Sequence, residues 1–337
     1  MPPVCRRPAG SSKFCTGYAP TVPPTDVLFV ADPAQALNPT ADTTYVMITE
    51  ALRRGHRPWL ATLDGVALEE EQAWARAVPV TVEGEGGPVA HAGDAARRPM
   101  AEFGVVLMRK DPPFDADYLT ATWILDRAAT LVLNHPAGLR HANEKLSIHR
   151  FPHLTPRTRI LRRADDLHRT LADFGGKMVV KPVYGFGGRA VLVAREDDAN
   201  LNAIFELATH EGATWTVAQE FVPGVSEGDK RIVMIDGVAE GAVLRVATRG
   251  EARSNFHVGG VGVKTTLSED DRRICEEVGP FLREHGLYFA GIDVIGGRLT
   301  EINVTSPTGM QEINRLDGLS GDDTMQARFW AGIERRM

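Results

Sequence analysis

The sequence contains few cysteines and no long apolar run. Its three cysteines, Cys5, Cys15 and Cys275, have neither a disulfide framework nor a zinc spacing, which favours a reducing, cytoplasmic location. No stretch approaches the roughly 20 apolar residues of a membrane helix. The net charge of −6 comes from acids and bases mixed along the chain, which predicts no nucleic-acid partner and no membrane anchor.

The length and apolar content predict a globular chain of several units. With 337 residues, 43% of them hydrophobic, we expect two or three packed units. Residues 1–25 differ from the rest, because they are rich in proline and contain no acidic residue. They lack the apolar core of a secretory signal, and their prolines oppose the amphipathic helix of a transit peptide. We expect a disordered leader there, with a transit peptide as the alternative.

The pattern of the first half predicts alternating strands and helices. Residues 26–32 form an apolar run, residues 43–54 have helical spacing between an Asp42 N-cap and Gly55, and residues 58–63 form a second apolar run. Strand, helix and strand in this order indicate a parallel α/β unit. The Gly-, Pro- and Ala-rich residues 81–99 are expected to form a loop.

From Asn143 onward the pattern changes to paired strands. Residues 178–194 contain two β-runs around a glycine-rich turn, and residues 230–247 form a hairpin pattern around Asp236 and Gly237. Residues 267–286 predict an amphipathic helix that begins with a capping box of Ser268 and Asp271. Cys275 lies beside the apolar stripe of this helix, so we expect it to pack rather than react.

The glycine-rich turn is a candidate phosphate site. The stretch "KPVYGFGGRAV" has glycines that allow a tight turn with exposed N–H groups. It matches neither the Walker loop nor the dinucleotide fingerprint, and a plain hairpin turn remains the alternative. Lys181, at the end of an apolar strand, favours the phosphate interpretation, because its burial without an anionic partner would be costly.

Basic residues and a second glycine-rich segment follow. Arg231 and Arg245 lie on the two strands of one predicted hairpin. Residues 247–262 contain Arg253 and Asn255 among several glycines. This composition fits a mobile loop that closes over anionic ligands, and a flexible surface loop is the alternative.

The stretch "GIDVIGGRLTEINVTSPTG" is a candidate magnesium hairpin. Glu301 and Asn303 are two residues apart and share a strand face. A simple two-residue Gly296–Gly297 turn would place Asp293 on the opposite face. A three-residue loop, or a bulge beside the two-residue turn, would place Asp293 opposite Glu301. Because opposed carboxylates repel unless a cation lies between them, the metal interpretation requires one of these last two registers. A solvated strand face is the alternative.

The order of these features resembles bacterial glutathione synthetases of the ATP-grasp superfamily. The resemblance extends from about Val27 to the C-terminus. It rests chiefly on "LMRKDPPFD", "NEKL", the lysine and glycines of the turn, "EGDKRIVMIDG" and "TEINVTSPTG". It implies an α/β fold (α+β in the C-terminal half), in which a Rossmann-like N-terminal domain precedes an ATP-grasp fold. The implied domains are residues 26–142, a small lid domain over 143–218, and a C-terminal domain over 219–337 with the mobile loop 247–262.

The resemblance also implies roles for individual residues. The implied ATP-binding residues are Lys145, Lys181, Gly187, Gly188, Glu220, Phe221, Val222 and Asn303. The implied metal ligands are Asp293, Glu301 and Asn303. The implied catalytic residues are Arg231, Arg245, Arg253 and Asn255. The implied substrate-binding residues are Asp32, Asn38, Arg109, Asp111, Ser306 and Thr308.

The implied reaction is the ATP-dependent ligation of γ-glutamylcysteine to glycine through an acyl phosphate. It implies two Mg²⁺ ions, with Mn²⁺ as an alternative, small-molecule substrates and a homo-oligomer such as a tetramer. Arg189, Val261 and Gly309 depart from the family pattern, so another ATP-grasp carboxylate–amine ligase with a different acid or amine is the alternative. A nucleotide-binding scaffold is disfavoured because the implied metal and phosphate ligands are all present.

Overall fold

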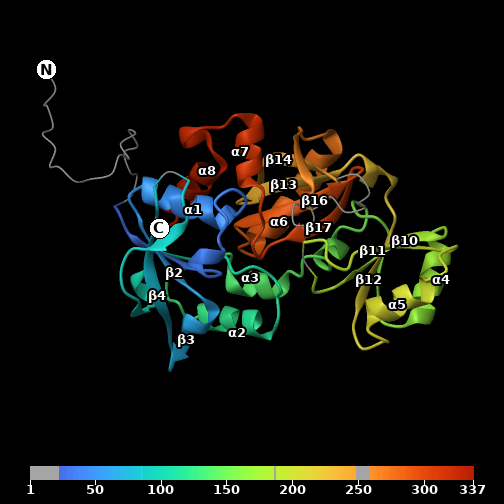
Figure 1. The fold of residues 1–337 in the computed structure, drawn as a ribbon, viewed down its shortest axis with the longest axis horizontal. Coiled ribbons are helices and arrows are strands. Elements are labelled where there is room, and N and C mark those ends of the chain that lie inside the picture. The colour runs from blue at the N-terminus through green and yellow to red at the C-terminus, as the bar shows by residue number, and fades with distance from the viewer. Residues whose placement is uncertain (1–22, 85, 186, 248–258) are drawn as a thin grey trace, which may run out of the picture.

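The computed structural model describes residues 23–84, 86–185, 187–247 and 259–337. The predicted leader is therefore almost wholly outside the described residues, as are Phe186 and most of the predicted mobile loop. The described chain folds around three β-sheets (Figure 1).

The first sheet has a parallel centre with an antiparallel extension. The parallel strands run in the order β2-β1-β7-β8. Their bounds are Arg57–Ala61, Asp26–Val30, Val105–Met108 and Leu131–Leu133. The long antiparallel strand β4 (Gln72–Val82) joins β2 and also pairs with β3 (Val66–Glu69), β5 (Val89–His91) and β6 (Ala96–Pro99). The expectation of a loop over residues 81–99 is wrong, because two short strands in this segment complete pairs with β4.

Helix α1 (Thr43–Arg53) begins as the sequence predicts. The Asp42 side chain accepts a hydrogen bond of 2.7 Å from the Thr44 amide, which satisfies one of the free N–H groups of the first turn. Helices α2 (Ala116–Leu125) and α3 (Pro136–His141) follow β7 and β8. This alternation of strand and helix builds the expected α/β unit.

The second sheet forms a small unit with its own core (at the right in Figure 1). Its antiparallel strands run in the order β11-β10-β12-β9, with bounds Leu192–Arg195, Lys177–Pro182, Thr216–Glu220 and Thr158–Leu161. Helices α4 (Ala164–Asp173) and α5 (Leu201–Thr209) bury Leu167, Leu171 and Phe205 against it. This sheet lies within the predicted lid domain, apart from the last two residues of β12. The domain boundaries themselves stay predictions.

The third sheet is antiparallel and shares its core with the first. The strand order is β15-β14-β13-β16-β17, with bounds Val261–Lys264, Val238–Val246, Asp229–Ile235, Phe289–Ile295 and Arg298–Asn303. Helix α6 (Glu269–Glu284) has the predicted capping box of Ser268 and Asp271, and Cys275 is buried beside its apolar stripe. One hydrophobic core contains Phe29 of β1 together with Phe289 of β16 and Trp330. The first and third sheets are therefore packed through a continuous core.

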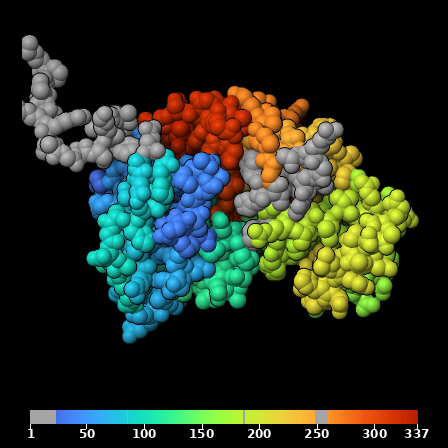
Figure 2. Space-filling model, in the orientation of Figure 1, coloured from blue at the N-terminus to red at the C-terminus, as the bar shows by residue number. Residues whose placement is uncertain are grey.

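The C-terminal helices close over the first sheet. Helices α7 (Met310–Asp317) and α8 (Met325–Glu334) lie beside α1 (Figure 1). The Trp330 indole donates a hydrogen bond of 2.8 Å to the Met47 carbonyl. Figure 2 shows the same arrangement in a space-filling view, with the C-terminal residues (red) directly against the N-terminal ones (blue to cyan). Among the described helices, none has the length and apolarity needed to cross a membrane.

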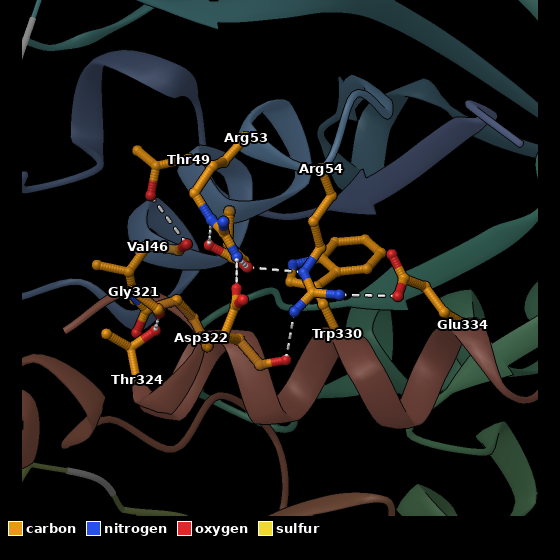
Figure 3. A network of polar contacts seen from close by, with 12 residues as sticks. Val46, Thr49, Arg53, Arg54, Gly321, Asp322, Thr324, Trp330 and Glu334 are labelled. Atoms are coloured by element: carbon orange, nitrogen blue, oxygen red, sulfur yellow. Dashed lines mark hydrogen bonds and ion pairs between the residues drawn. The ribbon is translucent and has the colours of Figure 1, made fainter. Parts of the chain in front are cut away.

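A buried ionic network fastens α8 to α1 (Figure 3). Arg54 donates to Glu50 at 2.6 Å, to Glu334 at 2.7 Å and to the Ala327 carbonyl at 2.8 Å. His56 lies 3.3 Å from the second Glu334 oxygen. Burial lowers the pKa of His56, although Glu334 partly opposes that shift. Glu334 thus joins two basic side chains from the N-terminal unit.

We expect Glu334→Ala to lower the free energy of unfolding by about 3–5 kcal/mol, because it leaves a buried Arg54 without one of its carboxylate partners. Urea unfolding followed by circular dichroism measures the effect. Glu276→Ala, which removes an exposed carboxylate from α6, is the control and should change the value by no more than about 0.5 kcal/mol. Equal losses in the two variants would contradict a stabilising network.

Candidate active site

The hairpin of β16 and β17 has the register that the metal interpretation requires. Gly296 and Gly297 both have positive φ, and Ile295 pairs with Arg298, so the turn contains two residues. The register then shifts, and Asp293 pairs with Glu301. The extra residue is Thr300, whose hydroxyl donates a 3.1 Å hydrogen bond to the Asp293 carbonyl. The predicted bulge beside a two-residue turn is confirmed, and it places both carboxylates on one face.

Basic side chains neutralise these two carboxylates. Arg231 donates to both oxygens of Asp293, at 2.6 and 3.0 Å, and Arg245 lies 3.0 Å from Asp293 Oδ1. Burial alone would raise the pKa of Asp293, but the two arginines hold it well below its usual range. Burial likewise opposes the ionisation of Glu301, and the pKa of Glu301 is nevertheless lowered, by Lys181 at 3.1 Å and by Lys145. Both acids are therefore charged at neutral pH.

The donors present suit a hard divalent cation. Asn303 lies on the same face and donates a 3.0 Å hydrogen bond to Asp293 Oδ2, so two carboxylates and one amide converge. The described residues contain no group of three His, Cys, Asp or Glu side chains placed to hold a metal. A metal here would need water or phosphate oxygens to complete its shell. Mg²⁺ binds in that way in nucleotide enzymes.

The two predicted phosphate lysines are buried beside the glycine turn. Lys181 is 5% exposed at the end of β10, and Lys145 is 4% exposed. The Lys145 ammonium contacts the Gly185 carbonyl, so it reaches the turn itself. Gly187 and Gly188 have φ of 62° and 74°, which side-chain-bearing residues rarely adopt. Lys145 therefore links the turn to the Glu301 carboxylate, on which both lysines act.

The predicted hinge is partly committed to other contacts. Arg157 donates to both carboxylate oxygens of Glu220, at 3.1 and 2.7 Å, and lowers its pKa. The Lys177 ammonium lies 3.2 Å from the centre of the Phe221 ring. Val222 lies against the hairpin turn, because a Cβ on Gly296 would be 3.0 Å from its Cγ1. A role of the Glu220 carboxylate in binding a ribose therefore requires the Arg157 pair to open.

A cavity of about 290 Å³ brings together predicted residues from three parts of the chain. Eight of the predicted residues line it. They are Asn38 and Asp111 from the N-terminal unit, Gly187 from the glycine turn of the small unit, and Arg231, Arg245, Asn303, Ser306 and Thr308 from the third sheet and the segment after it. Asp42, Glu144 and Thr305 also line it. A second cavity of about 540 Å³ shares Pro112, Glu144 and Thr305 with the first.

Arg109 and Asp32 do not line this cavity. The buried Arg109 donates to the Thr44 hydroxyl and to the Pro307 carbonyl, each at 3.2 Å. Burial lowers its pKa, against the attraction of nearby carboxylates. Asp32 pairs with Lys110 at 2.9 Å and accepts a 2.9 Å hydrogen bond from the Asp111 amide. Both side chains support segments that line the cavity, and direct contact with substrate stays a prediction.

Two predicted residues, Arg253 and Asn255, lie outside the described residues. Three acids at the site were missed as site residues, and one of them, Asp42, was predicted only as an N-cap. Glu144 accepts from the Thr305 hydroxyl at 2.8 Å and from the Val304 amide at 3.2 Å, so it fixes the segment after β17. Asp229 lies next to Arg245. The only signals were that Glu144 directly precedes the predicted Lys145 and that Asp229 lies two residues before the predicted Arg231.

Comparison with solved structures shows the fold. The chain is similar to the D-cycloserine synthetase DcsG, with a TM-score of 0.64 and 15% identity over 92% of this chain and 99% of that one. It is also similar to an ATP-grasp RimK domain protein from Sphaerobacter thermophilus, with a TM-score of 0.59 and 18% identity over 90% and 98% of the two chains. At these identities the likeness shows the fold alone, and that fold is ATP-grasp.

Sequence comparison places the chain more narrowly. The model of the prokaryotic glutathione synthetase N-terminal domain matches residues 25–140, and that of the ATP-grasp domain of the same enzymes matches residues 144–318. The glutathione synthetase of Thermosynechococcus vestitus is 41% identical over 305 residues, which cover 87% of this chain and 96% of that protein. The chain belongs to the prokaryotic glutathione synthetase family. It is an ATP-dependent ligase, and membership of the family implies the use of a divalent metal.

We expect Lys181→Met to weaken MgATP binding by about tenfold or more, because a charge-assisted hydrogen bond to phosphate is lost. Isothermal titration without the acid substrate measures the dissociation constant. The control is Lys264→Met, which removes an exposed ammonium from β15 and should leave the constant unchanged. Unaltered binding in Lys181→Met would remove this lysine from the nucleotide site.

Proposed function

We propose that the chain joins γ-glutamylcysteine to glycine, with conversion of ATP to ADP and phosphate. The observation that supports this proposal best is the cavity in which Arg231, Arg245 and Asn303 face Asn38 and Asp111. A cavity with two guanidinium groups suits an acid substrate that becomes an acyl phosphate. The 41% identity to a glutathione synthetase over most of both chains supports the particular acid and amine.

The reaction needs little covalent participation by the protein. A carboxylate oxygen of the dipeptide attacks the γ-phosphorus of ATP, the bond from that phosphorus to the β,γ-bridging oxygen breaks, and ADP leaves. The glycine nitrogen then attacks the acyl carbon, the carbon–oxygen bond to phosphate breaks, and the nitrogen loses its proton to solvent or phosphate. Catalysis therefore depends on positioning, charge neutralisation and exclusion of water.

The described residues have positions suited to these tasks. Lys145 and Lys181 would hold the transferred phosphoryl group near the glycine turn, and Arg231 and Arg245 would steady the developing acyl phosphate. Bound Mg²⁺ would supply charge neutralisation between the phosphate oxygens, held by Asp293, Glu301 and Asn303. Two Mg²⁺ ions with Mn²⁺ as a substitute, a homo-oligomer such as a tetramer and a cytoplasmic location are further parts of the proposal.

ADP release is the direct test of the substrates. With γ-glutamylcysteine and glycine both present, we expect steady ADP release, and omission of either should stop it. ADP release that does not depend on glycine would refute the proposal. A panel of other acids and amines completes the test, because a different pair that is better by orders of magnitude would assign the chain to another ligase reaction.

Glu301→Ala is expected to reduce turnover by at least about a hundredfold, because the metal loses a carboxylate opposite Asp293. The same coupled ADP assay measures it at saturating MgATP. Asp173→Asn, which removes an exposed carboxylate of the small unit, is the matched control and should retain full turnover. Near-normal turnover in Glu301→Ala would exclude this residue from the metal site.

A further inference from the structure

Asp229 is a buried acid that adjoins the site without lining its cavity. It is the first residue of β13, it is 6% exposed, and it pairs across the sheet with Arg245 of β14. Arg245 lines the cavity and Asp229 does not. Arg245 is therefore the cavity residue with which Asp229 forms an ion pair.

A single nitrogen of Arg245 is shared between two carboxylates. Its Nη2 lies 2.5 Å from Asp229 Oδ2 and 3.0 Å from Asp293 Oδ1. The Asp293 carboxylate is crowded, because it also binds Arg231 and Asn303. Asp229 differs, since its buried Oδ1 has no hydrogen-bond partner among the described residues. Asp229 can accept more from Arg245, whereas Asp293 has little capacity left.

We propose that Asp229 is a positioning residue that retains Arg245 at the cavity wall when Asp293 binds a divalent cation. A cation can bind Asp293 only if some of the present N–H donors release its oxygen lone pairs, and Arg245 already has a shorter contact with Asp229. A small shift of the guanidinium from Asp293 to Asp229 would free a ligand oxygen and keep the arginine charge facing the acid substrate. This inference rests on the proposed function in one respect, the role of Asp293 as a metal ligand.

The inference predicts competition when Asp229 loses its charge. In Asp229→Asn, Asp293 is the one that remains of the two carboxylates described above as contacts of Arg245. The cation must then displace a charge-assisted hydrogen bond that can no longer shift to Asp229. A purely structural role would instead reduce the stability of the protein without changing the competition between Arg245 and the metal.

The test measures Mn²⁺ binding to the full-length protein by electron paramagnetic resonance, at saturating ADP and without acid or amine substrate. We expect Asp229→Asn to raise the Mn²⁺ dissociation constant about tenfold. Asp173→Asn, the surface control, should leave it unchanged. Asp229→Glu, which keeps the carboxylate, should bind Mn²⁺ more tightly than Asp229→Asn. If Asp229→Asn does not fold, Asp229→Glu is compared with wild type instead. Near-native Mn²⁺ affinity in Asp229→Glu then supports the inference, and a tenfold loss overturns it.

The decisive comparison uses an Arg245→Met background. If Asp229 acts through Arg245, adding Asp229→Asn to Arg245→Met changes the Mn²⁺ affinity no further. An equal loss in both backgrounds, or no loss in the single variant, overturns the inference. The assay contains neither γ-glutamylcysteine nor glycine. If the ADP-release test fails but the Mn²⁺ affinities change as the inference predicts, only the proposed substrates are refuted.

Discussion

The pairing of Asp293 with Arg231 and Arg245 is the interaction on which the site depends. A carboxylate that is 2% exposed would be costly to ionise without charged partners. Two arginines from neighbouring strands and one amide from β17 provide those partners. This arrangement exists only because Thr300 is inserted as a bulge, since a regular two-residue hairpin would turn Asp293 to the other face of the sheet.

The same hairpin is the place where the three sheets meet. Lys181 reaches Glu301 from the small sheet, and Arg109 reaches the Pro307 carbonyl from the first sheet. Arg231 also donates to the Thr308 carbonyl at 3.2 Å. The small unit has a hydrophobic core of its own, whereas the first and third sheets share one. Polar contacts at the site therefore join the small unit to a larger packed body.

Much of this could be predicted from local patterns, and the failures have physical reasons. The Asp42 cap, the Ser268 capping box and the Gly296–Gly297 turn are properties of a few adjacent residues, and the structure has all three. The sequence does not decide which register places Asp293 opposite Glu301, because the pattern allows either a bulge or a longer loop. The pairing of Glu220 with Arg157, and the pairs that β4 makes with β5 and β6, depend on distant residues. Neither has a local signal.

The balance of charge explains how so many ionic groups are tolerated below the surface. The contacts of this face join three basic side chains, Arg231, Arg245 and Lys181, with three acids, Asp229, Asp293 and Glu301. Adding a cation to this set would leave an excess of positive charge unless anions arrived with it. Polyphosphate and a substrate carboxylate supply that negative charge, so metal and substrates should bind more favourably together than separately. In the proposed reaction, a cation at Asp293 and Glu301 would leave Arg231 and Lys181 available to the anions, whereas Arg245 would stay paired with Asp229.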